Sequence, residues 1–190
     1  GLGVIRARPF NHLGPGQSDR FVASAVASRI ARNEMAGESD VPVGNLSARR
    51  DFTDVRDVVR AYRLLAEHGV PGEAYNVCRG RDVAVQEVAD RLIALAERPM
   101  ALVTDPDLLR PVDTPVLRGD CTRLRDATGW SPEITFDQTL ADVLDDWRAG
   151  SRKAIDCGLS AASAVTFDQR LVTSARSERR GFIARLSNED

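Results

Sequence analysis

The chain has 190 residues and a formal net charge of −2, with 43% hydrophobic and 28% charged residues. This size and balance are typical of a globular domain that can bury a core. The charge excludes the basic footprint of a nucleic-acid-binding protein, and no apolar run approaches the ~18 residues of a membrane span. Cys78, Cys121 and Cys157 and the two histidines show no metal-binding spacing, so we expect free thiols, a cytoplasmic protein and no metal site.

The first half of the chain predicts alternating strands and helices. A strand within 3–10 ends at Pro9, and Ser18 or Asp19 is placed to cap a helix that carries Phe21 to Ile30. Short extended pieces at 41–46 and 49–53 follow. Asp54 can cap a helix over 55–68 that Gly69 ends, and its apolar stripe is predicted as Val55, Val58, Val59, Tyr62, Leu65 and Ala66.

The second half continues the alternation. The expected elements are a buried strand at 74–78, a helix at 84–97, a strand at 100–104, a loop at 105–114, and helices at 122–128 and 139–148. Strands that alternate with helices indicate an α/β fold. Residues 150–190 carry 7 basic and 5 acidic residues without a sustained period. We therefore predict one folded part over 1–150 and an atypical, poorly ordered tail over 151–190.

Three stretches could carry chemistry. The first is Arg8-Pro-Phe-Asn-His-Leu-Gly-Pro-Gly-Gln17, which follows a strand of the parallel type. Open α/β sheets bind ligands where such strands end, and Asn11 and His12 would supply donors and acceptors there. Asn, Gly and Pro are also ordinary turn formers, and spacing alone slightly favours that interpretation.

The second stretch runs from Gly44 to Asp57 and reads GNLSARRDFTDVRD. An arginine beside a short strand can bind phosphate through two parallel hydrogen bonds, with Asp51 or Asp57 orienting it. The alternative is a solvated charge cluster with internal salt bridges. The third stretch is Leu109-Arg110-Pro111-Val112-Asp113, which presents one arginine on a rigid loop and on its own is typical of a plain surface loop.

Taken in order, these stretches, followed by YNVC, LRPVDTPVLRGD and TGWSP, resemble the C-terminal half of extended short-chain dehydrogenase/reductases, the NAD-dependent epimerase/dehydratase family. Within that family the sequence motifs are similar to those of the branch that acts on GDP-sugars, GDP-mannose 4,6-dehydratase and GDP-4-keto-6-deoxy-D-mannose reductase. The resemblance covers about residues 1–150. It implies the last strands and helices of a Rossmann-like parallel sheet together with a small mixed α/β substrate-binding domain.

The resemblance also implies residue roles. Asn11 matches an asparagine that hydrogen-bonds the sugar-nucleotide diphosphate. Arg50 matches an arginine that binds the diphosphate or the ribose side of GDP, and Arg110 matches a second phosphate-binding arginine. Asn45 and Leu46 fall in the segment that runs along the nucleotide. The implied partner is a GDP-linked deoxy sugar or GDP-mannose. Two separated arginines suit such a dianionic ligand.

For the cofactor, NAD(P), the resemblance places Phe10 beside the nicotinamide and His12 near the same ligand. The dehydratases usually carry arginine where this chain has Gly16-Gln17, and Trp-Gly where it has Phe52-Thr53. These motif residues therefore favour the reductase, which forms GDP-D-rhamnose, over the dehydratase.

The family's catalytic and pyrophosphate motifs do not occur in this sequence. No GxxGxxG turn is found, and Tyr62 and Tyr75 are followed four residues later by Ala66 and Arg79, not lysine. Lys153, the single lysine, lies outside the matched region. We therefore expect a part that lacks the family's N-terminal half, with no catalytic residue of its own and dimerisation only if that half is supplied. A non-catalytic GDP-sugar-binding remnant and a decayed fragment remain alternatives.

Overall fold

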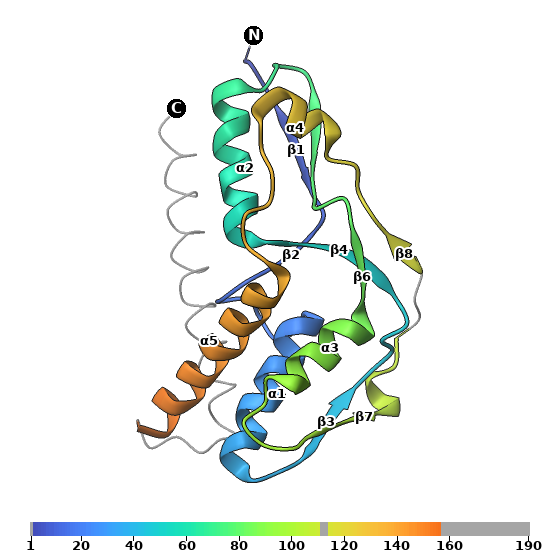
Figure 1. Ribbon diagram of the computed structural model, residues 1–190, viewed down its shortest axis with the longest axis vertical. Helices are drawn as coiled ribbons and strands as arrows, with labels where there is room; N and C mark the ends of the chain where they lie inside the picture. Colours follow the sequence, from blue (N-terminus) through green and yellow to red (C-terminus); the bar gives the residue numbers. More distant parts are fainter. Residues whose placement is uncertain (1, 111–113, 157–190) are drawn as a thin grey trace, which may run out of the picture. The chain divides into compact units, whose positions relative to one another are not determined.

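The computed structural model describes residues 2–110 and 114–156. The chain divides into two compact units, Gly1–Arg148 and Ala149–Asp190, and the contacts given below lie within the first. Parallel strand pairs alternate with helices along this unit (Figure 1), which confirms the α/β class.

Two of the sheets are parallel pairs. β1 (Arg6–Pro9) lies beside β5 (Ala74–Val77), and β3 (Asp40–Val43) lies beside β7 (Ala101–Thr104). Parallel strands normally occur in larger sheets with both faces covered. In the described structure, however, every residue of β1 is exposed.

The third sheet is organised around β4 (Arg49–Asp54), the longest strand. β4 pairs in parallel with β2 (Asn11–Leu13), antiparallel with β6 (Asp82–Ala84) and in parallel with β8 (Val116–Leu117). Residues 11–13, expected in a loop, are a strand because β4 supplies their backbone partners. The first and second sequence motifs are thus joined side by side.

The helices match the sequence pattern where caps are strong. α2 (Val55–His68) ends at Gly69 and α4 (Thr122–Thr128) ends at Gly129, whose φ of 68° is the left-handed conformation that glycine adopts without strain. The Asp54 side chain accepts from the backbone N–H of Arg56, which confirms it as the cap of α2. The helices are α1 (Val22–Ala36), α2 (Val55–His68), α3 (Val85–Ala94), α4 (Thr122–Thr128) and α5 (Phe136–Asp156), with a short 3-10 helix, η1 (Pro106–Leu108).

Two details of the helix predictions are wrong. The N-cap of α1 is Phe21, which makes no side-chain cap hydrogen bond, so neither Ser18 nor Asp19 caps this helix. On α2, Val59 and Tyr62 are exposed by 59% and 40% instead of joining a buried stripe. α2 buries Val58, Ala61 and Leu65, a narrower apolar face.

The tail prediction is tested only in part. Residues 151–156 continue helix α5, so the end of the helical pattern near Gly150 was placed too early. The remainder of the predicted tail, 157–190, lies outside the described residues.

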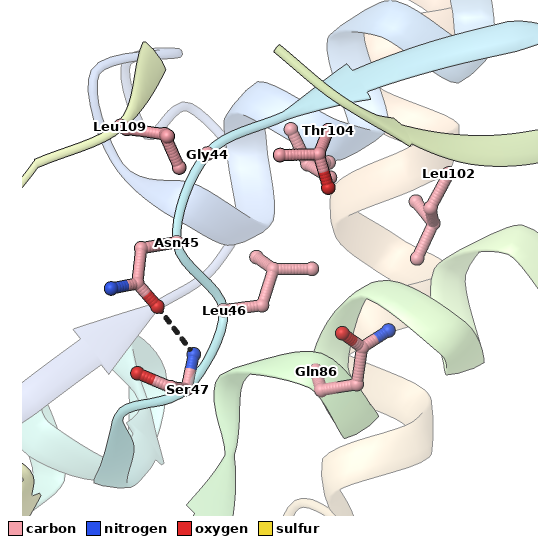
Figure 2. Close-up of a pocket in the computed structure, with 9 residues that line it drawn as sticks. Gly44, Asn45, Leu46, Ser47, Gln86, Leu102, Thr104 and Leu109 are labelled. Atoms are coloured by element: carbon pink, nitrogen blue, oxygen red, sulfur yellow. Dashed lines mark hydrogen bonds between the residues drawn. The ribbon is translucent and has the colours of Figure 1, made fainter. Parts of the chain in front are cut away.

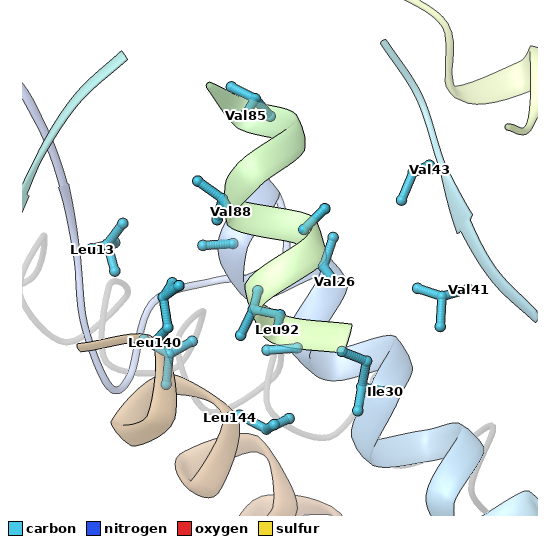
Figure 3. Packing of buried hydrophobic residues seen from close by; sticks show 14 of the residues in the cluster. Leu13, Val26, Ile30, Val41, Val43, Val85, Val88, Leu92, Leu140 and Leu144 are labelled. Carbon is cyan, nitrogen blue, oxygen red and sulfur yellow. The ribbon is translucent and has the colours of Figure 1, made fainter. Parts of the chain in front are cut away.

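The larger hydrophobic core lies between α1, α3, α5 and β3 (Figure 3). Ile30, Leu92, Leu140 and Leu144 have no exposed surface, and each such side chain contributes on the order of 2 kcal/mol through burial. Arg29 ties α1 to β3 by donating to the Pro42 carbonyl at 2.8 Å. This core fixes β3, and with it the segment that follows β3.

A second core lies under α2 and α4, with Trp130 at 1% and Tyr75 at 2% exposure. The Trp130 indole donates to the Asp57 carbonyl at 3.0 Å, so its polar atom is satisfied. The Asp57 carboxylate in turn accepts from the backbone N–H groups of Glu133 and Ile134. Asp57 therefore fastens the 130–134 segment to α2.

Candidate functional site

The first motif and the second motif meet where β2 pairs with β4. Asn11 lies opposite Phe52 and His12 opposite Thr53. Two buried side-chain oxygens of the described residues lack a hydrogen-bond partner, Asn11 Oδ1 and Thr53 Oγ1. Buried polar atoms are nearly always hydrogen-bonded, so each of these two oxygens indicates a contact that other atoms would complete.

Phe10 and His12, the residues expected near the cofactor, lie on either side of Asn11. Phe10 is half-buried against the second core, and its backbone N–H donates to the Val77 carbonyl at 3.0 Å. The His12 ring is exposed, with Nδ1 3.2 Å from the Phe10 carbonyl oxygen. The His12 carbonyl accepts from the Gln17 side chain at 2.8 Å, which closes the turn after β2.

The turn between β2 and α1 does not fit a dinucleotide pyrophosphate. Such a group needs free backbone N–H donors and no nearby anion. The N–H of Gly16 donates to the Asp146 carboxylate at 2.7 Å, so an anion of the protein already takes this donor. Five residues further on, α1 begins without a side-chain cap at Phe21. A pyrophosphate here would face the Asp146 charge instead of a helix N-terminus.

Asp51 is the organising carboxylate of the central sheet. It is fully buried and accepts backbone hydrogen bonds from Arg79, Gly80 and Gly119 at 2.8, 2.9 and 3.3 Å. Burial raises the pKa of Asp51 above its usual range, and these three donors limit the rise. Neither Asp51 nor Asp57 contacts the Arg50 guanidinium, so the expectation that one of them orients an arginine there is wrong. Asp51 instead holds two loops against β4.

The two neighbouring arginines of β4 differ in their partners. Arg49 makes an ion pair with Asp82, so the interpretation as an internal salt bridge is correct for this residue. Arg50 donates to two carbonyls, those of Arg49 at 2.8 Å and Pro115 at 3.4 Å. No carboxylate of the described residues pairs with Arg50, so its charge is not neutralised within them.

A hollow of about 480 Å³ lies at the end of β3 (Figure 2). Its walls come from the segment after β3, from the start of α3, from β7 and from the residue after η1. The lining residues are Val43, Gly44, Asn45, Leu46, Ser47, Gln86, Leu102, Thr104 and Leu109. Leucine side chains therefore face a rim of hydroxyl and amide groups, a mixture typical of small-molecule sites.

Two contacts shape this hollow. The Asn45 side chain accepts from the Ser47 N–H at 2.9 Å, which turns the chain away from β3 (Figure 2). The N–H groups of Val85 and Gln86, which α3 leaves without a side-chain cap, donate to the Ala48 and Leu46 carbonyls at 2.8 and 3.1 Å. The start of α3 is thereby held against the rim.

Gly44 permits the close approach of the second and third motifs. A Cβ on Gly44 would lie 2.2 Å from the carbonyl oxygen of Leu108, closer than atoms can pack. The β3 end and the loop after β7 therefore meet backbone to backbone. Leu109 lines the hollow, and the exposed Arg110 follows it in the chain.

The structure thus joins the predicted site residues in two groups. Asn45 and Leu46 line the hollow, with Arg110 adjacent in the chain to another lining residue. Asn11 and Arg50 lie on the central sheet and are not among the lining residues. Sequence reasoning missed Ser47, Gln86 and Thr104. For Gln86, the only sequence signal is its place at the start of a helix; its approach to Leu46 is a long-range contact.

Within residues 2–110 and 114–156, no group of three His, Cys, Asp or Glu side chains could hold a metal ion. No helix in that part of the chain is long and apolar enough to cross a membrane.

The parallel strands and the alternating helices are shared with solved structures of extended short-chain dehydrogenase/reductases of the epimerase and dehydratase class, of which the chain matches about half. Residues 1–143 match the family model of GDP-mannose 4,6 dehydratase, and the chain belongs to this family. GDP-6-deoxy-D-mannose reductase from Pseudomonas aeruginosa is 42% identical over 154 residues, which cover 80% of this chain and 51% of that protein. GDP-mannose 4,6 dehydratase 2 from Arabidopsis thaliana is 25% identical over 149 residues, covering 77% and 39%.

Solved structures agree with this assignment. RMD from Pseudomonas aeruginosa, complexed with NADPH, superposes with a TM-score of 0.72 at 42% identity, covering 77% of this chain and 49% of that one. UDP-glucose 4-epimerase from Thermotoga maritima, with UDP-glucose, gives a TM-score of 0.66 at 26% identity, covering 76% and 46%. The chain spans about half the length of the relatives it matches.

Proposed function

We propose that this chain is the GDP-sugar-binding part of an NAD(P)-dependent GDP-4-keto-6-deoxy-D-mannose reductase. The reaction would reduce the 4-keto sugar to GDP-D-rhamnose in nucleotide-sugar metabolism. The observation that carries the proposal is the hollow after β3, which is built by two predicted nucleotide-binding residues, Asn45 and Leu46. The 42% identity with a GDP-6-deoxy-D-mannose reductase supports the same activity.

The hollow suits the base of a nucleotide. The Leu46, Leu102 and Leu109 side chains offer apolar walls for a planar ring, while Gln86 and Thr104 offer polar groups for its edge. Its volume of about 480 Å³ lies within the usual range for small-ligand pockets.

The diphosphate would be bound by Arg50 and Arg110. Both arginines lack a carboxylate partner within the described residues, so each can offer a full charge and a planar set of donors. Asn11, whose side-chain oxygen is unsatisfied, would add a neutral hydrogen bond. The diphosphate dianion would thus meet two positive charges, and its third partner would be neutral.

Hydride transfer requires groups from outside this sequence. The sequence has no Tyr-x-x-x-Lys pair and no GxxGxxG motif, and the turn at Gly16 does not fit a pyrophosphate, so only Phe10 and His12 are proposed to approach NAD(P), at its nicotinamide end. We therefore propose that catalysis needs a partner half that carries these groups. The proposal includes a cytoplasmic location, as expected for a chain whose described cysteines are free thiols.

A GDP-mannose 4,6-dehydratase part, or a part of another sugar-nucleotide epimerase or dehydratase, is the second candidate, because the matching family model is that of the dehydratase. A binding remnant without catalysis is the third. A GDP-mannose dehydratase part and a GDP-sugar-binding remnant would contact GDP in the same way as the reductase part, so binding of GDP does not separate these three; a part of an enzyme for another sugar nucleotide would differ in the base that it binds.

Calorimetric titration of the purified chain with GDP, UDP and GDP-mannose tests the proposed nucleotide binding. We expect GDP and GDP-mannose to bind and to raise the melting temperature, with UDP at least tenfold weaker. Equal binding of all three, or of none, would refute the GDP-sugar site. Turnover is tested by following NADPH oxidation with the 4-keto substrate, with and without the N-terminal half of the Pseudomonas aeruginosa reductase. Turnover only with that half supports the reductase, and binding without turnover in both cases supports the remnant.

A further inference from the structure

Two free cysteines lie together in the second core, away from the hollow. Cys78 follows the last residue of β5, and Cys121 directly precedes α4. Both side chains are buried, with 0% and 4% exposure. The Cys121 sulfur lies 3.9 Å from where a Cβ on Gly80 would be, two residues after Cys78. The two residues are 43 positions apart in the chain, so the fold alone brings them together.

The backbone around the two thiols is held in register by other contacts. The Asn76 amide donates to the Asp120 carbonyl at 3.2 Å, one residue before Cys121. A Cβ on Gly119 would lie 2.4 Å from Cys78 Sγ, so the absence of a side chain there lets the segment pack against this sulfur. Asp51 also accepts from the Gly119 N–H at 3.3 Å. The loop that carries Cys121 is therefore fixed against β5.

The surroundings of the two sulfurs differ. The Arg125 guanidinium, one turn along α4, donates to Cys121 Sγ at 3.5 Å. A neighbouring guanidinium favours reaction of a cysteine as a nucleophile. Burial raises the pKa of Cys78 to about 12, and the Asp51 charge and Cys121 add to the rise. Because only Cys121 has this arginine contact among the described hydrogen bonds, Cys121 is the sulfur suited to react first.

We propose that Cys78 and Cys121 form a dithiol site that peroxides oxidise to a reversible disulfide. The Cys121 sulfur attacks one peroxide oxygen; an S–O bond forms, the O–O bond breaks, and the second oxygen leaves as water, giving a sulfenic acid. The Cys78 sulfur then attacks the Cys121 sulfur; an S–S bond forms, the S–O bond breaks, and the hydroxide leaves with the Cys78 proton as water. In total, two thiols and one peroxide give one disulfide and two waters. Thiol reductants restore the pair by exchange.

The disulfide would join the end of β5 to the start of α4. It would also restrain Gly119, which shares the Asp51 carboxylate with Gly80. This site does not depend on the nucleotide-sugar proposal, because it uses none of the residues of the hollow or of the diphosphate grip. Its failure and the failure of GDP binding are therefore separate results.

The test uses the full chain with Cys157→Ser, so that the third thiol cannot react. Treatment with hydrogen peroxide at neutral pH should lower the intact mass by about 2 Da, the loss of two hydrogens. Trypsin should then release peptides 64–79 and 119–123 linked by one disulfide, and dithiothreitol should separate them. Two free thiols after treatment of the folded chain, or oxidation to sulfinic acid at Cys121 without the linked peptide, would overturn the proposal.

Variants on α4 test the assignment of the reacting sulfur. Arg125→Gln should slow disulfide formation about tenfold or more, and Arg125→Lys should retain much of the rate. Arg123→Gln is the matched control, because Arg123 lies on the same helix as Arg125 but pairs with Glu73 before β5, and no hydrogen bond joins it to Cys121. Circular dichroism melts of the reduced variants verify that each is folded. Equal rates for Arg125→Gln and Arg123→Gln would show that Cys121 does not react with the help of Arg125.

Discussion

Gly44 and Leu108 approach each other so closely that a methyl group on Gly44 would lie 2.2 Å from the Leu108 carbonyl oxygen. This contact seats the loop after β7 against the end of β3. It thereby places Leu109 in the wall of the hollow and brings Arg110 beside it.

Gly44→Ala should therefore disturb both stability and binding. A Cβ cannot be accommodated without moving backbone, so we expect a loss of about 1–3 kcal/mol in the free energy of unfolding and weaker GDP binding. Gly150→Ala is the control, because a Cβ there meets nothing within 4 Å and lies in a helix. This control should be neutral or slightly stabilising. Urea unfolding measures the stability of the two variants, and titration measures their affinity for GDP. Unchanged GDP affinity in a folded Gly44→Ala variant would show that the loop after β7 is not part of the binding site.

The two arginines at the start of β4 should differ in their effect on GDP affinity. Arg50→Gln removes a charge that no described carboxylate neutralises, so we expect GDP to bind about tenfold or more weakly. Arg49→Gln removes a charge already paired with Asp82, so GDP affinity should change little. Calorimetry at two salt concentrations checks the pair. A larger loss of GDP affinity for Arg49→Gln than for Arg50→Gln would show that the diphosphate is not bound by Arg50.

Asp54 should stabilise the fold at neutral pH. Burial opposes its ionisation, but the hydrogen bonds and charge of Arg56 outweigh burial, so the pKa of Asp54 lies below its usual range. A carboxyl whose pKa is lowered by folding adds stability above its unfolded pKa of about 3.9, and this is lost as pH falls. Asp54→Asn should cost roughly 1 kcal/mol at pH 7, and the deficit in unfolding free energy should shrink toward pH 3. A constant deficit would mean that the charge is not responsible.

Asp51 should show the opposite slope. Because burial raises its pKa, the native carboxyl holds its proton to a higher pH than the unfolded one does. Its contribution is full below the unfolded pKa of about 3.9 and declines as pH rises through the folded pKa. Asp51→Asn should lose about 1–3 kcal/mol at neutral pH, because the amide offers one acceptor oxygen where three backbone donors use both oxygens of the carboxyl, and the deficit should be larger near pH 4. A deficit that grows with pH would contradict the assigned direction.

The fold was predictable where local chemistry sets a boundary. Asp54 and Gly129 fix the start of α2 and the end of α4 through their own side chain or backbone conformation. β6 and β8, with three and two residues, were missed because they exist only through pairing with β4. Nothing in their own composition distinguishes so short a strand from a loop.

The sequence predicted the part of the site whose residues lie close together in the chain. Asn45 and Leu46 directly follow Gly44, the glycine that the close contact with Leu108 requires. Arg50 lies a few positions further along the same sequence motif. Sequence reasoning could not show that Arg49 is neutralised by Asp82 while Arg50 is not, because that difference depends on a partner 33 positions away. Gln86 was missed for the same reason, since its place at the rim comes from a backbone bond to Leu46.

The shared acceptor at Asp51 has a consequence for hydrogen exchange. The amides of Arg79, Gly80 and Gly119 belong to two loops, yet all donate to one carboxylate on β4. An opening that withdraws Asp51 exposes all three protons to solvent at once, so they should exchange at a common rate. Amide exchange at these positions would then report the opening of β4, the strand that carries Arg50, without any ligand present.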